Sequence, residues 1–241
     1  VGWETALTIL ATLATATVFE RLGWGGGAAT KVVALLVVAA LVVGAGVLGF
    51  TVIMRLQTVI TIVTGVLTIV FVVLAAPQVD WGTVAALPSG SVEQVIGALV
   101  FLMTGFGLGW VNVAADYSRY LPRSASSRGV VGWTTFGASL APVVLLVFGL
   151  LLAGSSTELS DAIAKDPIGA LASTLPTWFL VPFAVVAVLG LVGGAVLDIY
   201  SSGLALLTLG LRIPRWSAAL VDGVIMVLGT VYVVFVADDF L

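Results

Sequence analysis

The sequence of 241 residues contains no cysteine and no histidine. These two absences exclude disulfide bonds, thiol nucleophiles, zinc sites built on cysteine or histidine, and proton relays through imidazole. Charged residues make up only 9% of the chain, whereas soluble domains carry about 25%. The net charge is −3 and no long basic cluster is present, so we expect no nucleic-acid partner. We also expect neither a metal nor an organic cofactor.

Hydrophobic residues fill 61% of the sequence and gather in long runs. A run of about 20 apolar residues is long enough to cross the hydrocarbon core of a bilayer as a helix. Seven such runs are present, at 1–19, 32–50, 57–76, 92–115, 129–153, 178–210 and 217–237. They predict an all-α, multi-pass protein of the cell membrane, with one transmembrane domain over residues 1–241 and the lipid bilayer as a partner. The chain lacks an initiator methionine and opens inside an apolar run, so we interpret it as a fragment of a longer protein.

Local signals mark where several helices begin or break. Ser91 with Gln94 predicts a capping box at the start of the fourth run. Asp166 followed by Pro167 predicts a short helix with proline in its first position. The sixth run is long for one span, at about 50 Å for 1.5 Å per residue. Its glycine cluster around 190–194 predicts that this helix is either strongly tilted or broken.

The most informative segment is 104–122, TGFGLGWVNVAADYSRYLP, where Gly105, Gly107 and Gly109 alternate inside an apolar run. Each glycine costs about 1 kcal/mol relative to alanine inside a helix, so the pattern predicts a broken helix near residues 104–110. Interrupted helices survive in a membrane only where they are buried in protein or line a cavity. An interrupted helix that carries an aromatic side chain is typical of a transporter's substrate site.

The seven tryptophans fall into two groups. Five lie near predicted span ends, where aromatic belts are expected: Trp24, Trp81, Trp133, Trp178 and Trp216. Trp110 lies inside a span, and we place Trp3 inside one as well. These two indoles therefore call for an explanation other than anchoring at the membrane surface.

The residues GWVNVAADYSRYLP at 109–122 closely resemble the sixth transmembrane helix of the nucleobase–cation symporter family, which includes the cytosine, purine, allantoin and hydantoin permeases. Residues 1–5, VGWET, resemble the middle of that family's third helix, and 198–204, DIYSSGL, the end of its eighth. The resemblance covers helices three to nine of a twelve-helix protein. It implies part of a fold of two inverted five-helix repeats, whose first and sixth helices are broken at mid-membrane.

The resemblance implies that a flat substrate is stacked between Trp110 and Trp3. Gly109, directly before Trp110, would let the ligand approach the backbone. Val113, about one turn after Trp110, would shape the pocket wall. Leu7 stands where some relatives carry a glutamine that binds substrate, so the ligand or its pose differs here.

Asp198 aligns with a family asparagine that hydrogen-bonds the substrate. A charged group at mid-bilayer costs at least about 2.5–3.5 kcal/mol and usually faces a cavity. We therefore expect Asp198 to accept hydrogen bonds from the substrate or to carry a coupling proton; the alternative is a surface position where it pairs with a base. Glu4 points about 100° away from Trp3 on the same helix. It either lines the site or pairs elsewhere.

The coupling ion is H⁺ or Na⁺. In the resemblance, the sodium site of the eighth helix maps onto Leu189, Val192 and Gly193. Val192 and Gly193 have no side-chain oxygen, which argues against sodium because sodium prefers hard oxygen ligands. Proton coupling through Asp198 or Glu4 is the alternative.

Asp116 and Arg119 are spaced i, i+3, so they can pair on one helix face as structural or gating residues. Asn112 points about 200° away from Trp110, so we expect it to brace a neighbouring helix.

The predicted function is secondary active import of a nucleobase or related heterocycle, with alternating access and a coupling cation. One alternative is transport of another small solute, such as an amino acid, on the same scaffold; two mid-membrane indoles favour a flat ligand instead. A channel or an intramembrane enzyme is less favoured. A channel would need a ring of carboxylates or a carbonyl filter motif, and the sequence has neither. An intramembrane enzyme would need paired acids for a metal, and the only adjacent acids, Asp238 and Asp239, follow the last span.

Overall fold

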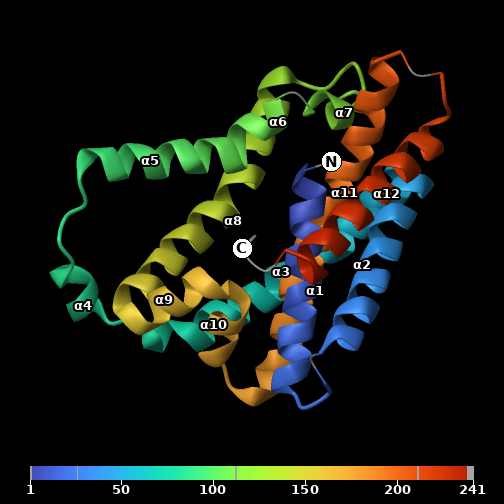
Figure 1. Cartoon of the computed structure of the whole chain (residues 1–241). Helices are drawn as coiled ribbons and strands as arrows, with labels where there is room; N and C mark the ends of the chain where they lie inside the picture. The colour runs from blue at the N-terminus through green and yellow to red at the C-terminus, as the bar shows by residue number, and fades with distance from the viewer. Residues whose placement is uncertain (1, 26, 112, 211, 238–241) are drawn as a thin grey trace. The chain divides into compact units, whose positions relative to one another are not determined.

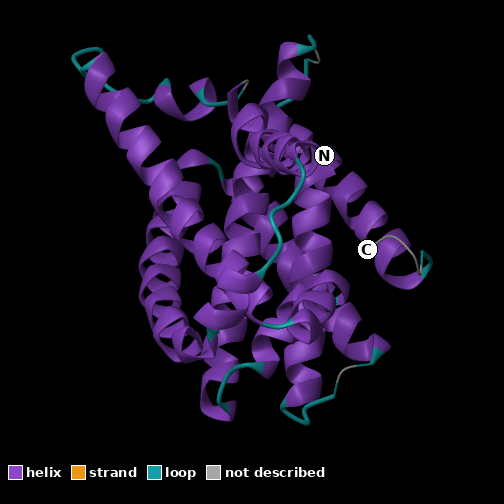
Figure 2. Ribbon diagram, turned by 90° about the vertical axis from the view of Figure 1, so that its left-hand side faces the viewer, coloured by secondary structure: helices purple, strands orange, loops and turns teal. Residues whose placement is uncertain are grey.

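The computed structural model of the chain describes residues 2–25, 27–111, 113–210 and 212–237. Asn112, Asp238 and Asp239 lie outside the described residues. The described part consists of helices and loops and contains no strand (Figure 2). Seven helical segments in it are long and apolar enough to cross a membrane: Gly2–Arg21, Ala28–Leu48, Phe50–Gln78, Val92–Ser118, Ser127–Ser155, Thr177–Thr208 and Arg215–Phe235. They overlap the seven predicted runs, which confirms the all-α integral membrane class.

The chain forms two compact units (Figure 1). The first unit comprises Val1–Gln78 and Asp161–Leu241, and the second comprises Val79–Ser160. A single transmembrane domain over residues 1–241 stays a prediction, as do the inverted repeats.

The first unit is built around α11 (Leu180–Thr208). This helix packs against α1 (Gly2–Arg21), α2 (Ala28–Leu48), α3 (Phe50–Ala75) and α12 (Arg215–Phe235). Shorter elements complete the unit: η1 (Ala76–Gln78), most of α9 (Thr157–Lys165), α10 (Pro167–Ser173) and η3 (Thr177–Phe179). Asp166 caps α10 by accepting a hydrogen bond from the Gly169 amide, and Pro167 is its first residue, as predicted.

Small residues let these helices approach closely. A Cβ atom on Gly46 of α2 would lie 2.9 Å from Cγ2 of Ile199 on α11. One on Gly223 of α12 would lie 2.6 Å from Cγ2 of Val43 on α2. Membrane helices associate through such close van der Waals packing, because lipid removes most of the hydrophobic drive between them.

The predicted break in the sixth run is absent, because α11 continues unbroken through its glycine cluster. The glycines serve packing instead. A Cβ on Gly194 would lie 2.8 Å from Cδ1 of Leu7, and one on Gly193 would lie 3.3 Å from Oε1 of Gln57. Of the two predicted alternatives, only a tilted helix remains.

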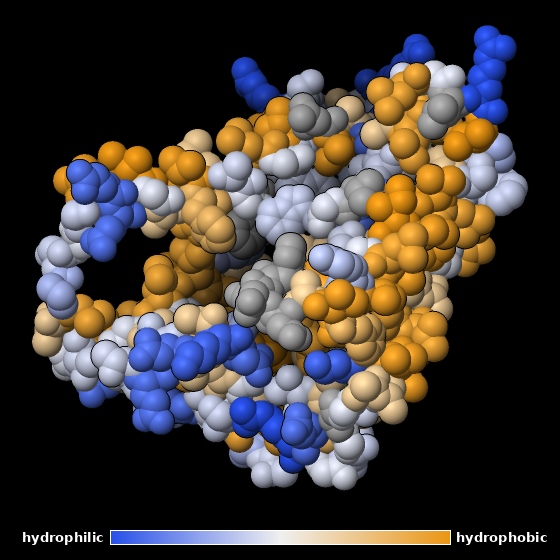
Figure 3. Space-filling view, in the orientation of Figure 1, coloured by the Kyte–Doolittle hydropathy of each residue, from blue (hydrophilic) through white to orange (hydrophobic). Residues whose placement is uncertain are grey.

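The surface of the first unit fits a lipid environment. A hydrophobic area covers α2 in Figure 3. This helix carries the exposed apolar side chains of Val33, Leu36, Val37 and Leu48. A helix apolar on its outer as well as its inner face is expected for a membrane span.

Arg215 closes the C-terminal end of α2. Its guanidinium donates hydrogen bonds to the carbonyls of Gly46 (2.7 Å) and Val47 (2.9 Å), which have no partner within the helix. It also lies 5.6 Å from the centroid of the Tyr200 ring. Gly49 follows with φ of +93°, and its missing side chain leaves room for the guanidinium, whose Nη2 would lie 2.5 Å from a Cβ.

Gly49→Ala is therefore expected to destabilise the protein by more than about 1 kcal/mol, because it forces a residue with a Cβ into the left-handed region and displaces Arg215. The measurement is thermal unfolding in detergent. Gly65→Ala, at an α3 position with open space around it, is the matched control and is expected to keep or raise the unfolding temperature. Equal unfolding temperatures for both variants would contradict this assignment.

The second unit contains α4 (Trp81–Ala86), α5 (Val92–Leu102), η2 (Met103–Leu108), α6 (Gly109–Val111), α7 (Ala115–Ser118) and α8 (Ser127–Ser155). The predicted capping box is present at the start of α5. Ser91 Oγ accepts a hydrogen bond from the backbone N–H of Gln94 (3.2 Å), and Gln94 Oε1 accepts one from the backbone N–H of Ser91 (2.8 Å).

Asp80 caps α4 at the polar edge of the second unit. The Thr83 amide, the Thr83 hydroxyl and the Gly82 amide donate to its carboxylate and hold the pKa of Asp80 below its ordinary value. A lowered pKa means that the capping interaction is present at neutral pH and is lost as the pH falls through that pKa.

Candidate functional site

The predicted interruption lies in the second unit, in a different form from the one expected. The α-helical pattern of α5 ends at Leu102, and residues Met103–Leu108 form a π-helical turn. The chain does not unwind there. A π-helical turn widens the helix locally and is frequent at functional sites.

Trp110 lies two residues after the π-helical turn, in the short helix α6 (Gly109–Val111). Its side chain is 38% exposed, and its ring lies 6.3 Å from the ring of Tyr117 at an interplanar angle of 53°. The backbone amides of Val113 (3.2 Å) and Ala114 (2.9 Å) both donate to the Trp110 carbonyl. Gly109, Trp110 and Val113 thus share one short stretch of backbone, and the indole offers an aromatic face.

Arg119 lies just beyond α7 and contacts Tyr120. Its Nη2 donates to the Tyr120 hydroxyl (2.9 Å), and its guanidinium carbon lies 4.9 Å from the centroid of that ring. Asp116 lies in the first turn of α7. Pairing of Asp116 with Arg119 stays a prediction.

In the first unit, α1 directs Trp3 and Glu4 to different surroundings. Trp3 is 56% exposed, whereas Glu4 is only 1% exposed. Leu7 packs against α11 at Gly194. The sequence left open whether Glu4 lines the site or pairs elsewhere, and its burial within the helix bundle places it among neighbouring side chains.

Those neighbours are polar. Ser202 of α11 donates a hydrogen bond to Oε1 of Glu4 (3.5 Å). Asp222 of α12 is completely buried and lies within side-chain hydrogen-bonding reach of Glu4 and Ser202. Asp198, one helical turn before Ser202, is half-buried and close enough to Glu4 for electrostatic interaction. Glu4 of α1 thus lies near Asp222 of α12 and within electrostatic range of Asp198 of α11.

The stretch of α11 aligned with the family's sodium site offers few oxygens. Val192 is buried among apolar side chains, and the Gly193 carbonyl accepts a hydrogen bond from Nε2 of Gln57 (2.6 Å). Leu189 lines an apolar cavity. No group of three or more histidine, cysteine, aspartate or glutamate side chains suited to a metal occurs among the described residues.

The family model described as permease for cytosine/purines, uracil, thiamine, allantoin matches residues 1–240. The chain belongs to this permease family. It is thus a multi-pass membrane protein of a transporter family whose substrates are small molecules of the nucleobase type. No curated protein and no solved structure matches it.

The predicted site residues of this permease divide between the two units. The first unit holds Trp3, Glu4, Leu7, Leu189, Val192, Gly193 and Asp198; the second holds Gly109, Trp110, Val113, Asp116 and Arg119. Within the first unit, the structure brings Glu4 and Asp198 together. A substrate sandwich between Trp3 and Trp110 stays a prediction, because these two residues lie in different units.

Sequence reasoning missed Asp222. The signal was present, since an ionisable residue inside a membrane span is a candidate functional group in its own right. Asp222 lies inside the seventh predicted run, yet that argument was applied only to Asp198 and Glu4. Its importance becomes clear only from its contact with Glu4.

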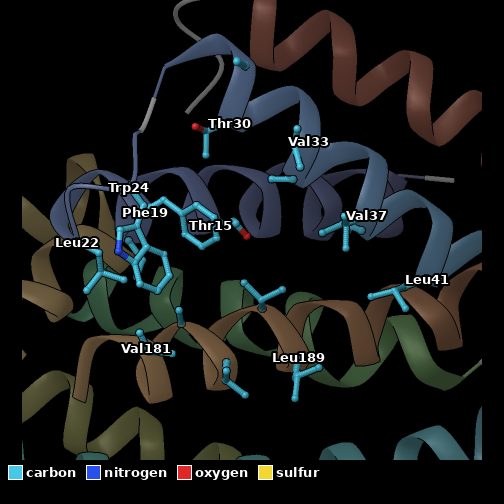
Figure 4. Close-up of a pocket in the computed structure, with 17 residues that line it drawn as sticks. Thr15, Phe19, Leu22, Trp24, Thr30, Val33, Val37, Leu41, Val181 and Leu189 are labelled. Carbon is cyan, nitrogen blue, oxygen red and sulfur yellow. The ribbon is translucent and has the colours of Figure 1, made fainter. Parts of the chain in front are cut away.

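The first unit of the permease also contains a partly open apolar pocket of about 610 Å³ between α1, α2 and α11 (Figure 4). Valine, leucine and alanine side chains form most of its lining. The polar groups of the lining are the hydroxyls of Thr15 and Thr30 and the indole N–H of Trp24, and the Thr15 hydroxyl already donates to the Ala11 carbonyl (2.8 Å). This lining suits an apolar occupant better than a nucleobase, because polar edges buried without partners are costly.

Proposed function

We propose that this permease is a secondary active transporter of the cell membrane that imports a nucleobase or a related flat heterocycle with a coupling cation. Alternating access would expose the site to each side of the membrane in turn. The observation that supports this best is Trp110, which lies two residues after a π-helical interruption in a chain matched to the family over residues 1–240. Stacking of a base on an aromatic side chain is worth roughly 1–3 kcal/mol.

In this proposal the substrate is stacked between Trp110 and Trp3, and Asp198 with peptide groups near Gly109 binds its polar edges. The position of Asp198 supports that role. It lies 18 residues after the start of α11 and 10 residues before its end, or about 27 Å and 15 Å along the helix. This depth disfavours the alternative that Asp198 is a surface carboxylate. In the same proposal, Asp116 and Arg119 act in gating.

The favoured coupling ion is the proton. Sodium needs a cage of oxygen ligands. The aligned stretch of α11 supplies no side-chain oxygen at Leu189, Val192 or Gly193, and the Gly193 carbonyl already accepts from Gln57. Carboxyl groups, in contrast, are gathered at Glu4 and Asp198.

The test is uptake of radiolabelled cytosine, adenine, uracil and allantoin by proteoliposomes containing the transporter, with protein-free liposomes as the control. We expect saturable uptake that an uncoupler abolishes and that replacement of Na⁺ leaves unchanged. Uptake that depends on Na⁺ would keep the substrate class and overturn proton coupling. Absence of saturable uptake for all four compounds would overturn the substrate class and favour an amino-acid or other solute transporter.

A further inference from the structure

One face of α1 and one face of α12 form a buried polar seam. Successive turns of α1 place Glu4, Thr8 and Thr12 on one face, and successive turns of α12 do the same for Asp222, Met226 and Thr230. All six residues are almost completely buried. Thr8 donates to Sδ of Met226 (3.3 Å), and a Cβ on Gly229 would lie 3.0 Å from Cγ2 of Thr5, so α1 and α12 pack against each other here.

The other hydroxyls of the seam are satisfied within their own helices. Thr12 donates to the Thr8 carbonyl and Thr230 to the Met226 carbonyl, each at 2.8 Å. Glu4 and Asp222 are therefore the residues of the seam that can gain or lose a proton. Ser202 of α11 donates a hydrogen bond to Glu4.

A hydrogen bond between two carboxyl groups exists only if one of them carries a proton, since a carboxylate has no hydrogen to donate. Two ionised carboxylates held together away from water would repel each other strongly, so such pairs share one proton. Asp222 is completely buried and Glu4 is only 1% exposed, so both carboxyl groups lie away from water. Their side chains also lie within hydrogen-bonding reach of each other.

We propose that the Glu4–Asp222 pair is the proton-binding site of this permease, holding one shared proton that is taken up and released during transport. This proposal rests on the function proposed above and names its coupling group. In the loading step, one carboxylate and H⁺ form a carboxylic acid that donates to the other carboxylate. Release reverses this step, and no bond to the substrate forms or breaks.

Groups from two helices surround Glu4. On α11, Asp198 interacts electrostatically with Glu4, and Ser202 donates a hydrogen bond to Glu4. On α12, the Asp222 side chain lies within hydrogen-bonding reach of Glu4. Arg215, a basic residue of α12, donates to the α2 carbonyls of Gly46 and Val47. Asp198, which the proposed function assigns to the substrate, is thus also an ionisable neighbour of the pair.

The pair can be tested without transport, by infrared spectroscopy of the purified protein at pH 7, where exposed carboxyl groups are ionised. We expect a carboxylic-acid C=O band in the wild type that disappears in both Glu4→Gln and Asp222→Asn. Glu158→Gln and Asp161→Asn change matched, exposed acids of α9 and are expected to keep the band. Absence of the band from the wild type, or its survival in both pair variants, would overturn the proposal.

Transport supplies the second readout. One proton per base across about 100 mV supports roughly 50-fold accumulation. Glu4→Gln and Asp222→Asn are expected to lower the accumulation ratio to about one and to preserve base exchange, because either amide can still donate to its carboxylate partner. Full accumulation in both variants would refute the pair as the coupling site. A wild type with the band but without base transport would instead refute the proposed function and leave the shared proton standing.

Discussion

Trp110→Leu is expected to raise the KM for base uptake by roughly 5- to 150-fold, the equivalent of the 1–3 kcal/mol that base stacking contributes. Leucine keeps an apolar side chain beside the π-helical turn but removes the aromatic face. Trp110→Phe keeps a smaller face, so we expect an intermediate KM. The measurement is the concentration dependence of uptake for the best substrate, corrected for the amount of protein in the membrane.

Trp133 provides the matched control for this experiment. It lies on α8 of the same unit and is 76% exposed, as expected of an anchor near the membrane surface. Trp133→Leu makes the same chemical change on another helix, outside the interruption of residues 103–108, and is expected to leave KM unchanged. Equal KM values for Trp110→Leu and the wild type would remove the aromatic platform from the proposal, and an equal rise in both variants would indicate a general effect of losing an indole.

The features that could be predicted from the sequence are those that depend on neighbouring residues. Hydropathy over about 20 residues located all seven spans, because each helix must satisfy the same bilayer thickness. The capping box of Ser91 with Gln94 and the proline start at Pro167 were also predicted, since a cap joins residues three positions apart.

The two glycine-rich segments show where this local reasoning stops. The cost of glycine inside a helix predicts an interruption at 104–110, and it allows a second one at 190–194. Only the first is interrupted, as a π-helical turn. In α11, Gly194 accommodates Leu7 of another helix, so tertiary packing offsets the local cost. That contact joins residues 187 positions apart and cannot be deduced from either segment alone.

The carboxyl cluster was hidden for the same reason. Glu4 and Asp198 were singled out as isolated acids in apolar runs, which is a property of each run. That Glu4 meets Asp222 follows from the packing of α1 on α12, which also joins Thr8 to Met226 across 218 positions of the sequence. The chemistry changes with that contact, because a lone buried acid needs a counter-charge, whereas two acids together can share a proton.

Asp198→Asn is expected to change which base is preferred, by at least about tenfold in the ratio of KM values for cytosine and uracil. A carboxylate only accepts hydrogen bonds, so it favours the amino group of cytosine over the carbonyl that uracil carries in that place. Asparagine can donate as well as accept, and therefore loses most of that discrimination. An unpaired polar group in a buried site costs about 1–3 kcal/mol, which sets the scale of the change.

This substitution also separates substrate recognition from proton coupling. The Glu4–Asp222 pair stays intact in Asp198→Asn, so uptake is expected to remain sensitive to the uncoupler while the base preference shifts. Asp161→Asn on α9, the same chemical change at an exposed position, is expected to alter neither property. Loss of uncoupler sensitivity with an unchanged preference would assign Asp198 to the proton instead of the base. It would then be the third carboxyl of a single proton site, which its electrostatic interaction with Glu4 also allows.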